Sequence, residues 1–232
     1  MEHMLTRLEW LAGKESVAAL QRRSVAVFGC GGVGSFAIEG LVRSGVGRVV
    51  VIDGDVITPS NLNRQLIAEP DTIGRRKALV TAERAKRIRP EVTAEAHDIV
   101  YTAEVHPDFI KNLGVDFVID AVDMVTAKLD IIEQCHLNGI PCISSMGAGN
   151  KMQPELLRLA DINRTHTCPL AKVIRKELRK RGIKKHQVVF SPEAPITPVR
   201  DEDSKSPGSC MFVPSVAGLL MSGYVLRQLL GR

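Results

Sequence analysis

Short apolar runs alternate with longer amphipathic segments through the first 150 residues of the chain. The apolar runs predict buried strands at 24–29, 48–53 and 116–123, a weaker strand at 93–97 and the start of another within 141–149. The segments between them predict helices at 32–45, 74–89 and 126–139. Apolar strands that alternate with helices are typical of a parallel sheet covered on both faces. The pattern therefore predicts a doubly wound α/β fold with a mostly parallel sheet.

The pattern changes after residue 150. A further strand is predicted at 156–162, a basic helix at 169–182, and a flexible loop at 191–209, where proline, serine and charged residues gather. The last apolar segment, 210–230, is interrupted by Pro214, Gly218, Gly223 and Arg227. These interruptions favour a buried helix over a membrane span. We expect this second part to extend the sheet on its C-terminal side.

Composition narrows the class of protein. Hydrophobic residues make up 44% and charged residues 25% of the 232 positions, which is ordinary for a globular protein. The net charge of +5 permits a polyanionic partner without requiring one. The five cysteines form no C-x-x-C pair, which argues against a disulfide framework and a cysteine zinc site. Because the N-terminus also lacks an apolar signal region, we expect a cytoplasmic protein.

A glycine-rich turn follows the first predicted strand. The sequence FGCGGVGSF places Gly29, Gly31 and Gly34 in a G-x-G-x-x-G pattern, with Gly32 inside it, directly before a helix. A Cβ atom would block such a turn and keep a phosphate away, whereas the helix N-terminus offers free N–H groups to the anion. Asp53, at the end of the second strand, can bond a ribose hydroxyl. The arrangement predicts nucleotide binding in a Rossmann-like fold, without separating NAD from ATP.

The polar residues beyond the second strand favour a triphosphate. The stretch IDGDVITPSNLNRQLI is followed by Lys77, and the strand at 116–123 ends in Asp123. Arginine and lysine stabilise the charge that develops as pyrophosphate leaves, and a carboxylate at this edge of the sheet can hold Mg²⁺. Each residue alone could also be a surface charge or, for Asp123, a helix cap. Together they predict an ATP·Mg²⁺ site that contains Asp53, Asp55, Asn61, Arg64, Gln65, Lys77 and Asp123.

These motifs, taken in order, resemble the adenylation domain shared by ubiquitin-activating enzymes and the bacterial activators of sulfur-carrier proteins. The resemblance rests on G-x-G-G-x-G, D-x-D, S-N-L-N-R-Q, G-x-x-K and D-A-V-D. It implies that Asp53 holds the ribose, that Asn61, Arg64 and Lys77 contact phosphates, and that Asp123 is associated with magnesium. It also implies a homodimer, in which an N-terminal arginine reaches the neighbouring active site. The catalytic residues that it implies are Arg7, Arg64, Lys77 and Asp123.

Three later segments narrow the resemblance to one branch of this superfamily. SSMGAGNK (144–151), THTCPLAK (165–172) and GSCMFVPSVAG (208–218) are similar to the bacterial enzymes that cyclise threonylcarbamoyladenosine, a modified adenosine next to the anticodon of tRNA. The resemblance implies one adenylation domain over 1–232, with a nucleotide-binding half (1–150) and a substrate-side half (151–232). It implies that ATP adenylates the threonyl carboxylate. An intramolecular attack then closes a ring and releases AMP.

Three other functions stay open at this point. The first is activation of a carrier protein that ends in Gly-Gly, and the missing C-x-x-C pairs weigh against it because carrier activators usually hold zinc with them. The second is nicotinamide-dependent oxidoreduction, and the S-N-L-N-R-Q cluster and Lys77 weigh against that. The third is a non-catalytic, nucleotide-dependent adaptor. A sulfur-transfer partner, such as a cysteine desulfurase, is also left open.

The basic helix at 169–182 is predicted to contact the tRNA. Its cations include Lys172, Arg175, Lys176, Arg179 and Lys180. Few aromatic residues lie nearby, so such a helix would contact the phosphate backbone rather than recognise individual bases. The alternative is an ordinary solvated helix face.

Two cysteines, Cys168 and Cys210, lie in segments predicted to be irregular. Either could act as a nucleophile, as in the thioester-forming members of the superfamily. We expect both to be small, partly buried thiols instead, because intramolecular cyclisation needs no enzyme thioester. None of the six histidines forms a metal-ligand spacing.

Overall fold

Five apolar runs of the first half form neighbouring parallel strands in a computed structural model, which describes residues 2–197, 199 and 206–231. The strands are β1 (Ser24–Phe28), β2 (Arg48–Ile52), β3 (Thr93–His97), β4 (Phe117–Asp120) and β5 (Cys142–Ser145). Two more, β6 (Arg158–Asp161) and β7 (Gln187–Phe190), complete a seven-stranded sheet of order β3-β2-β1-β4-β5-β7-β6. Only β6 runs antiparallel to its neighbour. The predicted fold class and the extension of the sheet are confirmed.

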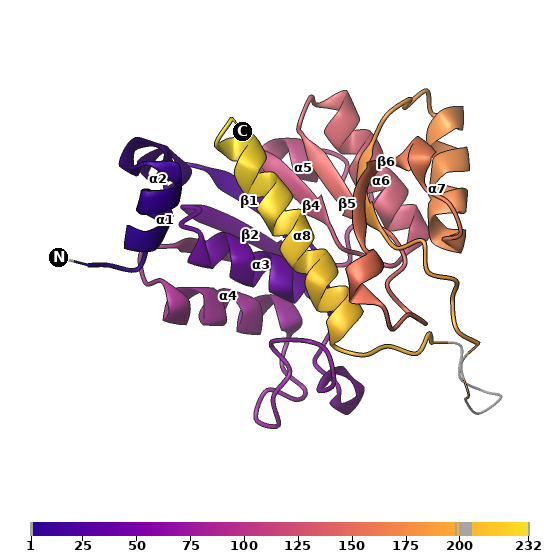
Figure 1. Cartoon of the computed structure of the whole chain (residues 1–232), viewed down its shortest axis with the longest axis horizontal. Coiled ribbons are helices and arrows are strands. Elements are labelled where there is room, and N and C mark those ends of the chain that lie inside the picture. The colour runs from indigo at the N-terminus through magenta and orange to yellow at the C-terminus, as the bar shows by residue number, and fades with distance from the viewer. Residues whose placement is uncertain (1, 198, 200–205, 232) are drawn as a thin grey trace.

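Helices cover both faces of this sheet (Figure 1). One layer consists of α3 (Gly34–Arg43), α4 (Lys77–Ile88) and α8 (Phe212–Leu229), and the other of α5 (Phe109–Asn112), α6 (Val125–Leu137) and α7 (Pro169–Lys180). Two short helices, α1 (Thr6–Ala12) and α2 (Lys14–Leu20), precede β1, and 3₁₀ turns form at Pro59–Asn61, Pro154–Leu156 and Ile162–Arg164. The chain reverses its strand order between β1 and β4, and open α/β sheets bind ligands at such a switch point.

Helix α8 packs closely on α3. A Cβ added at Gly218 would collide with the Val33 carbonyl, and one at Gly40 would collide with Ser222, so the small residues let the two helices approach. The apolar face of α8 joins the main core cluster, so the predicted buried C-terminal helix is confirmed. Within the part of the chain that the structure describes, no helix has the length and apolar character that a membrane span requires.

Some predicted boundaries were wrong. Helix α4 begins at Lys77 rather than at residue 74, because Gly74 adopts a φ of +83° and Arg76 still pairs with Val56 in an isolated bridge. Strand β4 ends at Asp120 rather than at residue 123, because the chain then turns across the glycine-rich loop. Helices α1, α2 and α5 and strand β7 were not predicted. Residues 198 and 200–205 of the predicted loop 191–209 lie outside the described residues.

Candidate active site

The glycine-rich turn joins β1 to α3 at the switch point of the sheet. Gly29 has a φ of +88°, and a Cβ there would lie 2.8 Å from the Ala121 carbonyl oxygen. A Cβ on Gly34 would collide with the carbonyl of Gly29. These two glycines are therefore required by close packing between the turn and the end of β4.

The middle of the turn is less crowded than its two ends. A Cβ added at Gly31 would meet nothing nearer than the Gln65 Nε2 atom at 3.7 Å. The Gln65 side-chain oxygen, Oε1, is buried and has no hydrogen-bond partner among the described residues. A cradle lined by main-chain N–H groups, with an unpaired acceptor beside it, fits a bound nucleotide that brings both phosphate oxygens and hydroxyl donors.

Asp53 connects the end of β2 to this turn. Its carboxylate accepts the backbone N–H of Cys30 at 2.6 Å and that of Asp55 at 2.8 Å. Burial raises the pKa of the Asp53 carboxyl, against the opposing effect of these two hydrogen bonds. The side chain therefore lies where the sequence predicts the ribose-binding acid. The neighbouring Cys30 is an inert packing residue, because burial raises the pKa of its thiol well above the ordinary value.

Lys77 is a buried cation at the start of α4. Its ammonium nitrogen lies 2.8 Å from a carboxylate oxygen of Asp55, and only 8% of the lysine side chain is exposed against 68% for the aspartate. The backbone N–H of Lys77 also donates to the Asp55 carbonyl. The alternative that Lys77 is a surface charge is therefore wrong.

Arg64 and Asn61 belong to the turn between β2 and α4. Asn61 is buried, and its side-chain oxygen accepts the Thr58 N–H at 3.0 Å, which stabilises the 3₁₀ turn. The Arg64 guanidinium donates to the Ser60 carbonyl at 2.7 Å. A Cβ on Gly32 would lie 3.5 Å from the Arg64 Cγ atom, so this arginine lies directly over the glycine-rich turn.

Asp123 is exposed three residues after β4 ends. Ala121, two residues before it, lies against Gly29 and Gly34. Asp123 is not a helix cap, because Met124 is the N-cap of α6 and makes no side-chain cap bond. Its carboxylate makes no hydrogen bond or ion pair to any described residue and is available to a cation.

Arg7 is not brought to this site within one chain. It is exposed on α1. The residue before α1, Leu5, packs against Gly45. Gly45 lies between the end of α3 and the start of β2, at the amino edge of the sheet and therefore opposite the glycine-rich turn. The proposed reach of Arg7 into a neighbouring subunit stays a prediction.

A buried polar network behind the site was missed by the sequence analysis. Asp120 and Lys128 form a fully buried ion pair at 2.7 Å. In the neighbouring strand, the Ser144 hydroxyl lies 2.7 Å from the His186 Nε2 atom. Burial lowers the pKa of His186 to about 3, so this ring is neutral at ordinary pH. The D-A-V-D motif contains two acids, Asp120 and Asp123. Only the structure shows that Asp120 is buried in an ion pair and has a structural role.

The three later segments that carry the closer resemblance converge at the carboxyl edge of the sheet. A Cβ on Gly147 would lie 3.5 Å from the Cys168 sulfur. Asn150 exchanges two hydrogen bonds with Gly208, at 2.6 and 2.7 Å. The Cys210 sulfur lies 3.9 Å from the Lys151 carbonyl. These contacts form the substrate-side half of the candidate site.

Lys151 is a buried cation that the sequence did not single out. Its ammonium group donates to the Ser191 carbonyl at 2.8 Å, and burial lowers its pKa. Nearby, the Glu193 carboxylate accepts the N–H groups of Met152 and Gln153. Lysine next to glycine and asparagine gives no sign of burial in the sequence, so no pattern could have found this residue. Cys168 is buried and Cys210 half-buried, and both thiols are free.

The cations of α7 are not equivalent. Arg175 donates to Thr165 at 2.7 and 2.9 Å, Arg179 donates to Asn163, and Lys180 pairs with Glu177. Lys172 and Lys176 are exposed, and their side chains make no hydrogen bond or salt bridge within the described part of the chain. These two lysines are the cations that can meet a phosphate without breaking an internal contact.

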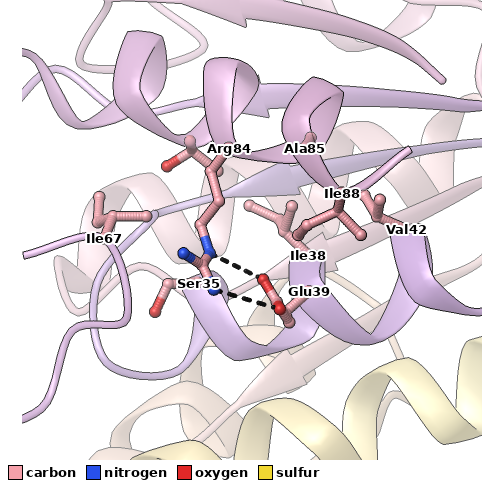
Figure 2. Close-up of a pocket in the computed structure, with 9 residues that line it drawn as sticks. Ser35, Ile38, Glu39, Val42, Ile67, Arg84, Ala85 and Ile88 are labelled. Carbon is pink, nitrogen blue, oxygen red and sulfur yellow. Dashed lines mark hydrogen bonds and ion pairs between the residues drawn. The ribbon is translucent and has the colours of Figure 1, made fainter. Parts of the chain in front are cut away.

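Two hollows lie away from the glycine-rich turn. Figure 2 shows the first, a crevice between α3 and α4 that is crossed by the ion pair of Arg84 and Glu39. Its volume of about 10 Å³ has room for roughly one water molecule. The second, of about 320 Å³, lies at the amino edge of the sheet near Cys142 and His186. Neither is lined by a predicted site residue.

The fold and the glycine-rich turn define an α/β protein of the nucleotide-binding type, with Arg64 and Lys77 near that turn. The chain matches the model of the ThiF family over residues 5–232 and belongs to that family. The tRNA threonylcarbamoyladenosine dehydratase of Bacillus subtilis is 44% identical over 245 aligned residues, which cover 99% of this chain and 96% of the relative. A solved structure of the Escherichia coli tRNA N6-threonylcarbamoyladenosine dehydratase in complex with ATP has a TM-score of 0.90 at 30% identity. The match covers 98% of this chain and 94% of the Escherichia coli chain. The sulfur carrier protein adenylyltransferase of Thermus thermophilus is 34% identical over 56% of this chain and 48% of its own length.

Proposed function

We propose that this chain is a tRNA threonylcarbamoyladenosine dehydratase, which adenylates the threonyl carboxylate with ATP and then closes a ring. The observation that carries the proposal is the extent of the similarity to the Bacillus subtilis relative, which runs through 99% of the chain. It includes the three segments that converge beside the glycine-rich turn. Carrier-protein activation is the weaker candidate, because the similarity to the sulfur-carrier enzyme spans 56% of the chain. Membership of the ThiF family also argues against a nicotinamide-dependent oxidoreductase.

The reaction needs two successive displacements. The substrate carboxylate attacks the α-phosphorus of ATP, which forms an acyl-adenylate and releases pyrophosphate. The carbamoyl group of the same nucleoside then attacks the activated carbonyl, loses a proton and expels AMP, so the nucleoside loses one water in total. Ring closure is intramolecular and therefore needs no second substrate.

Each part of the candidate site has a role in this scheme. The N–H groups of the glycine-rich turn hold phosphate oxygens, and Asp53 accepts a ribose hydroxyl. Arg64 and Lys77 stabilise the charge on the departing pyrophosphate. Lys77 already lies 2.8 Å from Asp55, so it exchanges a carboxylate for a phosphate when ATP binds.

Magnesium is part of the proposal. Asp123 offers an unpaired carboxylate beside the turn, and carboxylate oxygen is a ligand that Mg²⁺ prefers. When bound, the ion would neutralise charge on the phosphates. The tRNA contact through Lys172 and Lys176, the homodimer with Arg7 at its interface, a sulfur-transfer partner and the cytoplasmic location also stay predictions.

The proposal is tested by mass spectrometry of tRNA nucleosides after incubation with ATP and Mg²⁺. We expect threonylcarbamoyladenosine to lose the mass of one water, and we expect no change without ATP. ATP–pyrophosphate exchange is measured in parallel with modified tRNA and with a carrier protein that ends in Gly-Gly. Exchange that depends on the carrier protein and not on the tRNA would replace this function with carrier activation.

A further inference from the structure

Phe212 is an exposed aromatic residue at the edge of the candidate site. It is the first residue of α8 and is 61% exposed. Among the described residues, Trp10 is the other aromatic side chain exposed to this degree. An exposed phenylalanine gives up the stabilisation that burial provides, and it indicates a contact site where other exposed apolar side chains lie near it.

The segment around Phe212 is hydrogen-bonded to both halves of the site. The Asn63 side chain donates to the Ser209 carbonyl at 3.0 Å, which joins the segment to the nucleotide half. Asn150 bonds Gly208 on the substrate side. Pro214 lies beside Gly32, where an added Cβ would come within 3.2 Å of the proline ring. Phe212 is therefore held at a defined position beside the glycine-rich turn.

Other exposed apolar side chains come from segments that meet at Asn150. Ile196 donates its N–H to the Asn150 carbonyl, Met152 follows Asn150 by two residues, and Met211 precedes Phe212. All three are at least 46% exposed. We call Met152, Ile196, Met211 and Phe212 the apolar rim. It adjoins Arg64, a cation that lies over the same turn as Pro214.

We propose that Phe212 is a stacking platform for an unpaired nucleobase of the RNA substrate, with the apolar rim around it. This inference rests on the proposed function, because it needs a nucleoside presented from a tRNA loop. Proteins recognise single-stranded RNA by stacking unpaired bases on aromatic side chains. The nearby cation and phosphate cradle suit a nucleotide better than the apolar surface of a second protein copy. Phe212 thereby adds the aromatic contact that the basic helix α7 lacks.

Fluorescence tests the stacking directly. Trp10 is the single tryptophan of the chain, so the Trp10→Phe, Phe212→Trp double variant reports on position 212 alone. We expect an RNA stem-loop that carries threonylcarbamoyladenosine to quench this tryptophan, and we expect neither ATP nor a fully paired RNA duplex of equal length to do so. Quenching is measured without turnover, so it succeeds or fails independently of the dehydration reaction. Equal quenching by stem-loop and duplex, or none by either, would overturn the proposal.

The KM for modified tRNA and the oligomeric state of the protein distinguish base stacking on Phe212 from a contact between two copies of the chain. We expect Phe212→Ala to raise the KM for modified tRNA about tenfold while the affinity for ATP is unchanged. Phe212→Trp should restore the KM. The matched control is Leu219→Ala, since Leu219 is exposed two turns further along α8. If Phe212→Ala and Leu219→Ala both shift sedimentation to a smaller species and raise the KM alike, this face contacts another copy of the chain and the stacking proposal fails.

Discussion

The two halves of the candidate site hold their polar groups in different ways. In the nucleotide half, the key bonds join neighbouring element ends: Asp53 to Cys30, 23 positions apart, and Lys77 to Asp55, 22 apart. In the substrate-side half, Lys151 reaches Ser191, 40 positions away. The first bonds join residues that belong to spaced motifs, G-x-G-x-x-G, D-x-D and G-x-x-K. Lys151 lies in a segment recognised by resemblance alone, and only its bond to Ser191 shows what this lysine does.

The largest effect is expected from Lys77→Met, which tests whether the nucleotide half performs the chemistry. Removing one group that stabilises developing charge typically costs 10² to 10³ in rate. We expect ATP–pyrophosphate exchange to fall by roughly that factor, while the fold is kept because methionine fills the same buried space. The control is Arg75→Met, which removes an exposed cation two residues before Lys77 that is paired with Glu83. Equal losses in both variants would show that Lys77 has no special role.

The glycine-rich turn provides the next largest effect, this time on stability. Gly34→Ala forces a Cβ into the Gly29 carbonyl, and we expect the free energy of unfolding to fall by about 3 kcal/mol or more. Gly114→Ala is the matched control, since Gly114 has a φ of +56° with no atom within 4 Å of the added Cβ. There we expect a loss of about 1–2 kcal/mol from backbone strain alone. Urea unfolding measures both, and similar losses would refute the packing argument.

A smaller effect is expected at α7, which belongs to the substrate-side half. The double variant Lys172→Glu, Lys176→Glu should weaken tRNA binding about tenfold and flatten its salt dependence, since each lost phosphate contact removes about 0.7–0.9 from the slope. Lys111→Glu, on the exposed surface of α5, is the control for a single charge reversal elsewhere on the surface. Filter binding at several salt concentrations gives both quantities. An unchanged slope in the α7 variant would exclude this surface.

The smallest effect at neutral pH concerns His186 and the buried network behind the site. The folded protein holds this ring neutral with a pKa of about 3, whereas the unfolded chain has an ordinary value near 6.5. Between these values the unfolded state binds the extra proton, so stability falls as the pH decreases from 6.5, by up to about 1.4 kcal/mol per pH unit. His186→Gln should flatten this dependence. Unfolding curves at pH 7, 5.5 and 4.5 test it, and parallel slopes for both proteins would contradict it.

The centre of the sheet could be predicted because β1, β2 and β4 are apolar runs separated by helical patterns and glycines. The exception is β7 (Gln187–Phe190), which is as short as the predicted strands β4, β5 and β6. Its pairing with β5 and β6 places its three apolar residues in the sheet, and the sequence analysis did not assign them to a strand.

The same reasoning applies to the candidate site. Gly29, Gly34, Asp53 and Lys77 were predicted because phosphate binding and charge stabilisation require those residue types at fixed positions. The roles of Asp120, Lys128 and Lys151 could not be found, because their burial follows from how strands and helices stack. Lysine in a sequence indicates exposure far more often than burial, and the structure reverses that expectation three times, at Lys77, Lys128 and Lys151.

The packing of α8 on α3 has a consequence for fragment design. The last helix of the chain packs on α3 and β5, and its Tyr224 ring lies against Phe117 of β4. A truncated protein that stops at residue 150 would expose this surface to water and should aggregate, even though it keeps every phosphate-binding motif. Supplying residues 206–231 as a separate peptide should restore solubility by complementation. The nucleotide half can therefore be recognised from its sequence motifs, but we do not expect it to fold on its own.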